Sequence, residues 1–278
     1  MQGPLAQMVA LTCYGNAAIS GCSVTPFFPG HSTCTFCESV RFVAAQQVSG
    51  GGFETVAVAG SPDEWIQYLL SREMLGLRLR LLQRAQNHPH ISDRMSAGFV
   101  GGGRQWKIEV LRRDGASEFW FGKWEIGNKN APDRRIWQVT YGLCEIAQTE
   151  AVALRSLKEI TEELRPALKK IHAFSERENC GGFTRCFEQA LAALNNSQAD
   201  IGYHKDLFLP NSLSAAAVSL LKATMSAWVF GGMGSWNDMG FDGEVQAEYE
   251  RLSDRLFNLL NEAIEAAACS SMKTPAAQ

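Results

Sequence analysis

The spacing of hydrophobic residues changes along the chain, and this change predicts two structurally different parts. In the middle of the chain apolar residues alternate with polar ones, as at Trp106, Ile108 and Val110, which is typical of half-buried strands. Further on, apolar residues recur at every third or fourth position, which is the period of an amphipathic helix. We therefore expect an α+β protein with a β-rich domain at 1–147 and an α-helical domain at 148–278.

Turn-forming residues divide the first part into strands. Short apolar runs at 40–45 and 55–59 predict two strands, joined by consecutive glycines at 50–52. Three further strands should follow, separated by tight turns near Gly115 and Gly127. The short connections predict an antiparallel β-meander with one face packed on a helix.

One long helix is expected within this β-rich part. Ser61 is a favourable N-cap residue, and Pro62 suits the first helical position. Apolar residues then recur at helical spacing from Trp65 to Leu81. The pattern therefore predicts a helix that ends shortly before Asn87.

The second part is expected to consist of about four helices in a bundle-like arrangement. An apolar stripe at 154–171 predicts the first of them, which Pro166 should kink or divide. Similar patterns predict helices at 183–194, at 214–230 and after Asp242.

The composition is that of an ordinary globular protein. The chain has 278 residues, of which 46% are hydrophobic and 20% are charged, and its formal net charge is -3. Its apolar runs are too short to cross a bilayer. A small negative charge provides no general attraction for nucleic acid or for anionic membranes, so we expect neither as a partner.

The tetrapeptide at 19–22, which ends in Cys22, resembles a lipoprotein cleavage site. However, no Lys or Arg occurs before Arg41, and polar residues such as Gln7 and Asn16 interrupt the apolar stretch. We therefore expect a cytoplasmic protein whose thiols are mostly reduced.

Four cysteines near the N-terminus are candidates for a zinc site. Cys34 and Cys37 are spaced as a metal-binding or redox pair, and Cys13 and Cys22 could supply two more ligands. A zinc ribbon would show two closely spaced pairs, whereas Cys13 and Cys22 lie nine positions apart. We favour the alternative that these are small buried residues, and we expect no cofactor.

A glycine-punctuated loop at 228–243 is the most prominent candidate site. Its candidate binding residues are Gly232, Gly234, Trp236, Asn237 and Asp238, together with Tyr203 from another loop. Trp236 could stack on a ligand while the polar side chains select the ligand's polar groups. In the structural alternative, which we favour, Trp236 is a buried plug and its polar neighbours form turn hydrogen bonds.

His204 is the candidate acid/base residue, because imidazole titrates near neutral pH. Asp238 could orient His204 or bind a metal, and Trp236 could line the pocket beside them. No Gly-x-Ser-x-Gly motif or other catalytic signature is present in the sequence, so a surface histidine is the alternative that we favour.

Two functions remain open. The preferred one is a non-catalytic cytoplasmic protein that binds another protein, such as the neutralising partner of a toxin. Its support is the lack of a catalytic motif, the near-neutral charge and the aromatic residues suited to anchoring an interface. The alternative is a hydrolase acting on a small polar substrate between the two parts, with His204 and Asp238 as its catalytic pair.

Overall fold

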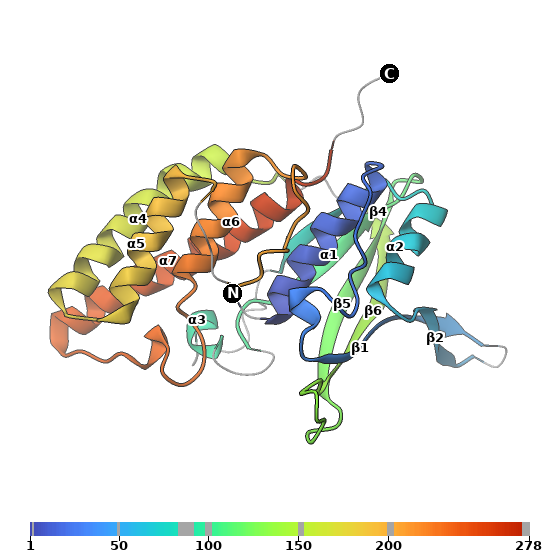
Figure 1. Cartoon of the computed structure of the whole chain (residues 1–278), viewed down its shortest axis with the longest axis horizontal. Helices are drawn as coiled ribbons and strands as arrows, with labels where there is room; N and C mark the ends of the chain where they lie inside the picture. The colour runs from blue at the N-terminus through green and yellow to red at the C-terminus, as the bar shows by residue number, and fades with distance from the viewer. Residues whose placement is uncertain are drawn as a thin grey trace.

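The computed structural model has the α+β fold that the sequence predicts. It describes residues 1, 3–48, 51–82, 92–97, 102–149, 153–198 and 203–273. Within these residues the chain forms seven helices and one six-stranded sheet. The helices of the C-terminal part pack side by side next to the sheet, and helix α1 (Gly3–Ile19) lies between the two layers (Figure 1).

The sheet is mixed, with the strand order β2-β1-β6-β5-β4-β3. Its strands are β1 (Cys37–Gln47), β2 (Phe53–Ala59), β3 (Gly76–Leu81), β4 (Trp106–Leu111), β5 (Ala116–Ile126) and β6 (Trp137–Gln148). The predicted antiparallel meander is formed by β4, β5 and β6, and β3 extends it by one strand. Strand β1 pairs in parallel with β6, which joins the β1–β2 hairpin to the meander. Gly50 of the predicted hairpin turn lies outside the described residues.

Four helices form the C-terminal part, close to their predicted positions. They are α4 (Leu157–Arg177), α5 (Gly182–Asn195), α6 (Ala215–Ala227) and α7 (Gly243–Cys269). Helix α4 packs against α5 and α7, and α6 packs against the same two helices. Helix α2 (Pro62–Ser71) covers β1 and β2, and the single turn α3 (Asp93–Ser96) lies against α7.

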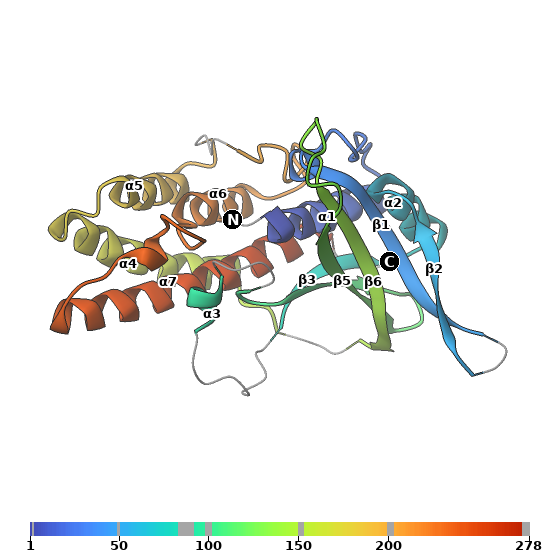
Figure 2. The same ribbon diagram turned by 90° about the horizontal axis from the view of Figure 1, so that it is seen from below.

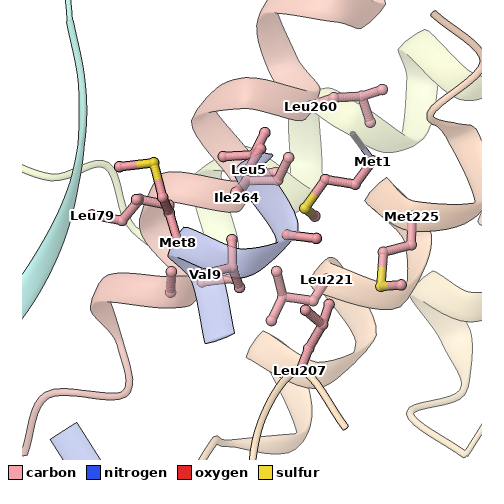
Figure 3. Packing of buried hydrophobic residues seen from close by; sticks show 14 of the residues in the cluster. Met1, Leu5, Met8, Val9, Leu79, Leu207, Leu221, Met225, Leu260 and Ile264 are labelled. Atoms are coloured by element: carbon pink, nitrogen blue, oxygen red, sulfur yellow. The ribbon is translucent and has the colours of Figure 1, made fainter. Parts of the chain in front are cut away.

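Helix α1 is absent from the sequence prediction because it is buried on nearly every side. A helix without an exposed face has no polar stripe, so its residues lack the period of an amphipathic helix. Figure 3 shows Leu5 and Met8 of α1 packed among Leu79 of the sheet and Leu221 and Ile264 of other helices. The centre of the hydrophobic core therefore lies around α1.

Polar side chains inside α1 are satisfied by hydrogen bonds to the sheet. The hydroxyl of Tyr141 donates to Gln7 Oε1 at 2.9 Å. Asn16 Oδ1 accepts from the N–H of Leu77 at 2.7 Å, and Asn16 Nδ2 donates to the carbonyl of Leu77 at 2.9 Å. These polar residues, which interrupt the apolar N-terminal stretch, connect α1 to the strands.

The predicted long helix is wrong in its length. Helix α2 ends at Ser71, and Leu77 and Leu81 lie on strand β3. Glu73, which lies between helix α2 and strand β3, has a left-handed φ of 50°, and this backbone conformation is incompatible with a continuing helix. A four-residue spacing fits both a helical face and the alternation of a strand, so the pattern could not separate the two. The expected helix end near Asn87 lies outside the described residues.

Helix α4 continues through Pro166, so of the two predicted effects of this proline the division of the helix is wrong and the kink stays a prediction. Proline removes one donor from the helix and leaves the carbonyl four residues earlier without its partner. Both Pro166 and Glu162 are exposed, so water can satisfy that carbonyl. The predicted apolar stripe is buried, as at Leu164 and Leu168.

The buried side chains of the sheet and of the helices form one continuous cluster. Both α1 and α7 pack on β3, and the predicted domain boundary between positions 147 and 148 lies at the end of β6. The division into two domains stays a prediction. Among the described residues, no helix combines the length and the hydrophobicity needed to cross a bilayer.

Candidate functional site

Trp236 begins the short 3-10 helix η2 (Trp236–Asp238) and is completely buried. Its indole Nε1 donates to Ser253 Oγ at 2.7 Å. Four aromatic rings surround the indole, and they belong to Phe174, Phe183, Phe187 and Tyr249. Trp236 is therefore a plug that fixes the loop, and its ring has no exposed face on which a ligand could stack.

Asn237 and Asp238 hold the same corner in place. Asn237 Nδ2 donates to the carbonyl of Arg94 at 2.9 Å, and Arg94 Nη1 donates to Asn237 Oδ1 at 3.1 Å. Asp238 accepts a hydrogen bond from the N–H of Gly234, whose φ of 82° places it in the left-handed region. Gly232, Gly234 and Asp238 are exposed, so they are the predicted loop residues that a partner could reach.

His204 and Asp238 lie in different hydrogen-bond clusters. His204 Nδ1 is 2.8 Å from Ser32 Oγ, whereas Asp238 bonds to Gly234 within its own loop. Tyr203, also expected at this site, is half exposed, and its ring centroid lies 5.2 Å from that of His204. Among the described residues no hydrogen bond or ion pair joins His204 to Asp238, and Asp238 closes its own turn instead.

The structure instead brings His204 together with Ser32 and Asp206. The N–H of Ser32 donates to Asp206 Oδ2 at 2.8 Å, and the hydroxyl of Ser32 donates to Asp206 Oδ1. Because a hydroxyl has a single proton, His204 Nδ1 must carry the proton in its own contact with Ser32 Oγ. In neutral His204 the basic nitrogen is then Nε2, and the ring is oriented through Ser32 and Asp206.

His31 also binds Asp206 and so stabilises this cluster. The N–H of Thr33 donates to His31 Nδ1 at 3.2 Å, so Nε2 carries the proton and donates to the carbonyl of Asp206 at 2.8 Å. The imidazole stacks on Phe27 with ring centroids 4.1 Å apart. Burial lowers the pKa of His31 and keeps the ring neutral, although Asp206 acts in the opposite direction.

The protonation states follow from burial and hydrogen bonding. Burial lowers the pKa of His204, which keeps this imidazole neutral at pH 7. Burial acts to raise the pKa of Asp206, but hydrogen bonds from Ser32 outweigh it, and the net pKa is lowered. The cluster thus pairs an ionised carboxylate with a neutral, oriented imidazole. It also connects the loop before α6 to the turn η1 (Ser32–Cys34).

Cys34 and Cys37 are neighbours in the fold, and Cys13 and Cys22 do not join them. Gln7 Nε2 lies 3.5 Å from Cys34 Sγ and 3.8 Å from Cys37 Sγ. A hydrogen bond from Cys34 lowers the pKa of Cys37. Cys13 is buried and Cys22 is exposed, and the described residues contain no cluster of three or more His, Cys, Asp or Glu suited to a metal. A zinc ion at Cys34 and Cys37 would need other ligands.

The two edges of the sheet differ in how their backbone groups are satisfied. At the β3 edge, the N–H of Leu82 donates to the carbonyl of Gln105 at 2.9 Å. Antiparallel pairs alternate between bonded and non-bonded positions, so Leu77, Leu79 and Leu81 direct their backbone groups away from β4. This edge faces α1 and α7.

Side chains of α1 and α7 close the β3 edge. They satisfy four of its outward backbone groups at distances from 2.7 to 3.2 Å. The partners are Asn16 for the N–H and C=O of Leu77, Cys269 for the C=O of Leu79, and Glu265 for the N–H of Leu81. A further strand therefore cannot pair here without displacing two helices.

Strand β2 forms the opposite edge, and this edge is open. The N–H of Val48 donates to the carbonyl of Gly52 at 3.0 Å, and alternation along the hairpin then directs the backbone groups of Phe53, Thr55 and Ala57 outward. All three residues are exposed, Phe53 at 73%. Among the described residues, no side chain hydrogen-bonds to these backbone groups. The β1–β2 hairpin also extends beyond the rest of the molecule (Figure 2).

The sequence of β2 offers little protection against pairing. Edge strands are usually blocked by Pro, by Lys or by inward-pointing charges. Of the seven residues Phe53–Ala59 only Glu54 is charged, and none is Pro or Lys. Val56 and Val58 are half-buried on the face that α2 covers. The strand therefore presents both the backbone groups and the composition of a strand-pairing surface.

Compared with protein-family models, with curated proteins and with solved structures, the chain gives no significant match.

Sequence reasoning missed both the cluster around Ser32 and the difference between the sheet edges. Ser32 and Asp206 are 174 positions apart, and no local motif connects them. The identity of the edge strands depends on the parallel pairing of β1 with β6, which also joins distant segments. The one local signal was the composition of β2, which is apolar and almost uncharged for a predicted surface hairpin.

Proposed function

We propose that this protein binds another protein, and that it does so by accepting a strand of its partner at the free edge of β2. The observation that carries the proposal is the contrast between the two edges. Side chains close the β3 edge, whereas the backbone groups of Phe53, Thr55 and Ala57 point outward from β2. Strand addition uses main-chain hydrogen bonds for affinity and side-chain contacts for specificity.

The partner is expected to present an extended segment with alternating apolar residues. On one face its side chains would extend the surface formed by Val56 and Val58, which α2 partly covers. On the other face they would contact the exposed ring of Phe53. An aromatic residue at such a position is a typical anchor of a protein interface.

The proposal includes a cytoplasmic location and a non-catalytic role, such as neutralisation of a toxin. A strand bound across an edge can hold a toxin without any chemical step. We favour this role over the hydrolase alternative, because the proposed catalytic pair, His204 and Asp238, make their hydrogen bonds in separate clusters.

The substitution Thr55→Pro tests this proposal directly. The N–H of Thr55 points away from β1, so proline removes an outward donor and leaves the hairpin's own hydrogen bonds intact. We expect the variant to fold with wild-type circular dichroism and to lose the bound partner. Proteins retained by the wild-type chain from native lysate, quantified by mass spectrometry, provide the measurement.

Thr55→Val is the matched control, because it keeps the N–H and the β-branched shape. The proposal requires the same stoichiometric partner on the wild-type chain and on Thr55→Val, and its loss on Thr55→Pro. A partner retained equally by a folded Thr55→Pro variant contradicts it. So does the recovery of no stoichiometric partner by the wild-type chain.

A further inference from the structure

The turn η1 and the start of strand β1 bring two thiols together next to helix α1. Cys34 ends η1 and Cys37 begins β1, and both side chains are buried. A hydrogen bond from the thiol of Cys34 to that of Cys37 joins the two sulfur atoms. The thiol of Cys37 donates in turn to the carbonyl of Thr33 at 3.7 Å. The two sulfurs are therefore neighbours that share a single proton.

Gln7 of α1 directs its amide nitrogen at both sulfurs. Gln7 Nε2 lies 3.5 Å from Cys34 Sγ and 3.8 Å from Cys37 Sγ. It also donates to the carbonyl of Thr33 at 3.3 Å, while the hydroxyl of Tyr141 donates to Gln7 Oε1 at 2.9 Å. If the amide were turned over, its oxygen would face the carbonyl oxygen of Thr33, so Nε2 must be the atom beside the sulfurs.

This arrangement is more than the burial of two cysteines requires. A free Cys behaves as a small hydrophobic residue and can be buried without a hydrogen-bond donor beside it. Here a completely buried amide is held by a completely buried tyrosine hydroxyl and directed at two sulfurs. Such oriented N–H groups stabilise thiolates, and hydrogen bonds behind the ligands are a regular feature of metal–thiolate sites.

We propose that Cys34 and Cys37 bind one Cu(I) ion as a pair of thiolates. The ion would take the place of the proton between the two sulfurs, and Gln7 would donate to the sulfurs from behind. Thiolates are soft ligands that select Cu(I), and this ion accepts a nearly linear arrangement of two sulfurs. Both thiol protons leave on binding, because the ligands must be deprotonated.

The number of available ligands decides between Cu(I) and zinc. Zinc in proteins takes four ligands in a tetrahedron. The part of the chain that the structure describes contains no cluster of three or more His, Cys, Asp or Glu suited to a metal, so a zinc site here would be incomplete. Cu(I) needs no more than the two sulfurs. The pair is therefore sufficient for Cu(I) and insufficient for zinc.

The surroundings of the pair also suit a small monovalent cation. Two thiolates and one Cu(I) leave a single net negative charge, which the nearby guanidinium of Arg135 partly compensates. Thr35 and Phe36, which lie between the two cysteines in the chain, are exposed, so the sulfurs lie directly beneath a surface turn. A bare ion can reach them when this short turn opens. Burial of the sulfurs then shields the ion from water and from competing ligands.

Titration of the reduced whole protein with Cu(I) under anaerobic conditions tests the proposal, with bathocuproine disulfonate as the coloured competitor. We expect one Cu(I) per chain to be held against the competitor, and X-ray absorption at the copper edge should show two sulfur neighbours. Zinc, offered in the same way against a zinc chelator, should not be retained.

Substitution of either ligand should remove the site. Cys34→Ser and Cys37→Ser should each weaken Cu(I) binding more than about 100-fold, because a ligand contributes more than its hydrogen-bond partner, whose loss costs about 10–100-fold. The matched controls are Cys180→Ser, which is buried, and Cys144→Ser, which is exposed. Both should bind Cu(I) as the wild type does.

Gln7→Leu tests the donor behind the ligands. It removes the N–H groups and should weaken Cu(I) binding about 10–100-fold while one ion per chain is still bound. Thr12→Val is the control, since Thr12 is another buried polar residue of α1 and donates only to the carbonyl of Met8 in its own helix. Circular dichroism establishes that each variant is folded. Equal affinity of folded Gln7→Leu and the wild type would contradict the proposed site.

The proposal is overturned if the reduced wild-type chain holds no Cu(I) against the competitor, whether or not the two thiols can be oxidised to a disulfide. It is equally overturned if folded Cys34→Ser and Cys37→Ser bind Cu(I) as tightly as the wild type, which would show adventitious binding at other cysteines. Strand β2 pairs with β1 only from Phe42 onwards, beyond Cys37. Failure here therefore leaves the proposed protein binding untouched.

Discussion

Single buried or half-buried polar side chains determine how distant segments of this chain are joined. Asn16 bonds to both backbone groups of Leu77, and Ser32 connects the turn η1 to Asp206. Trp236 has the same role in the glycine-rich loop, through Ser253. At Asn16 and Trp236, which are buried, loss of the partner leaves a polar atom unsatisfied, which is why these positions affect stability.

The first prediction concerns Trp236. Truncation to alanine should lower the free energy of unfolding by about 3–5 kcal/mol, because the indole is completely buried among four rings. Met233→Ala in the same loop is the control, since Met233 is fully exposed and should cost almost nothing. Urea denaturation measures both. A Trp236→Ala variant as stable as Met233→Ala would show that the ring is not part of the core.

A second prediction concerns the pH dependence at Glu265. Burial raises the pKa of Glu265, so folding favours the protonated carboxyl. The stabilisation is present below the ordinary value of 4.5 and is lost as the pH rises through the higher folded value. Glu265→Gln keeps an oxygen for the N–H of Leu81 and removes the charge. The melting temperature of Glu265→Gln should equal that of the wild type near pH 4 and should exceed it as the pH rises through the folded pKa of Glu265.

Thermal unfolding of both proteins across this pH range provides the measurement. Glu250→Gln, an exposed carboxyl on the same helix, is the control and should follow the wild type throughout. If the difference in melting temperature between Glu265→Gln and the wild type became smaller as the pH rises, this result would contradict a raised pKa of Glu265 in the folded protein.

Among the helices and strands, the sequence predicted best those in which apolar and polar residues recur with a regular period. Helix α4 exposes one polar face to water, and β4 alternates apolar residues with Lys107 and Glu109, although Glu109 is itself buried, so both periods are visible in the sequence. Helix α1 is buried on nearly all sides and shows no period. Strand β3 has two leucines at a spacing that also fits a helix, and only tertiary packing decides between them.

The edge strands illustrate why the sequence pattern of a single strand could not identify the free edge of β2 as a candidate binding surface. Whether a strand lies at an edge depends on pairing between distant segments, here β1 with β6. Whether an edge is open depends further on helices that pack beside it, as α1 and α7 do at β3. Neither property is encoded in the residues of the strand itself, although the nearly uncharged sequence of β2 is consistent with pairing.

At the level of the whole molecule, the helical layer and the sheet share a core around α1, and the free edge of β2 lies at the end of the sheet away from that layer (Figure 2). A partner that adds a strand there would meet the hairpin and α2 and would leave the C-terminal helices uncovered. The glycine-rich loop, which was the strongest candidate from the sequence, serves to anchor η2 against α4, α5 and α7.

Amide hydrogen exchange by NMR tests the difference between the two edges most directly. In the isolated protein, the amides of Phe53, Thr55 and Ala57 should exchange rapidly, and those of Leu77 and Leu81 should be protected by Asn16 and Glu265. After addition of the partner captured by the wild-type chain, the three β2 amides should become protected. Protection of these amides before the partner is added, or their continued rapid exchange in the complex, would contradict binding at the β2 edge.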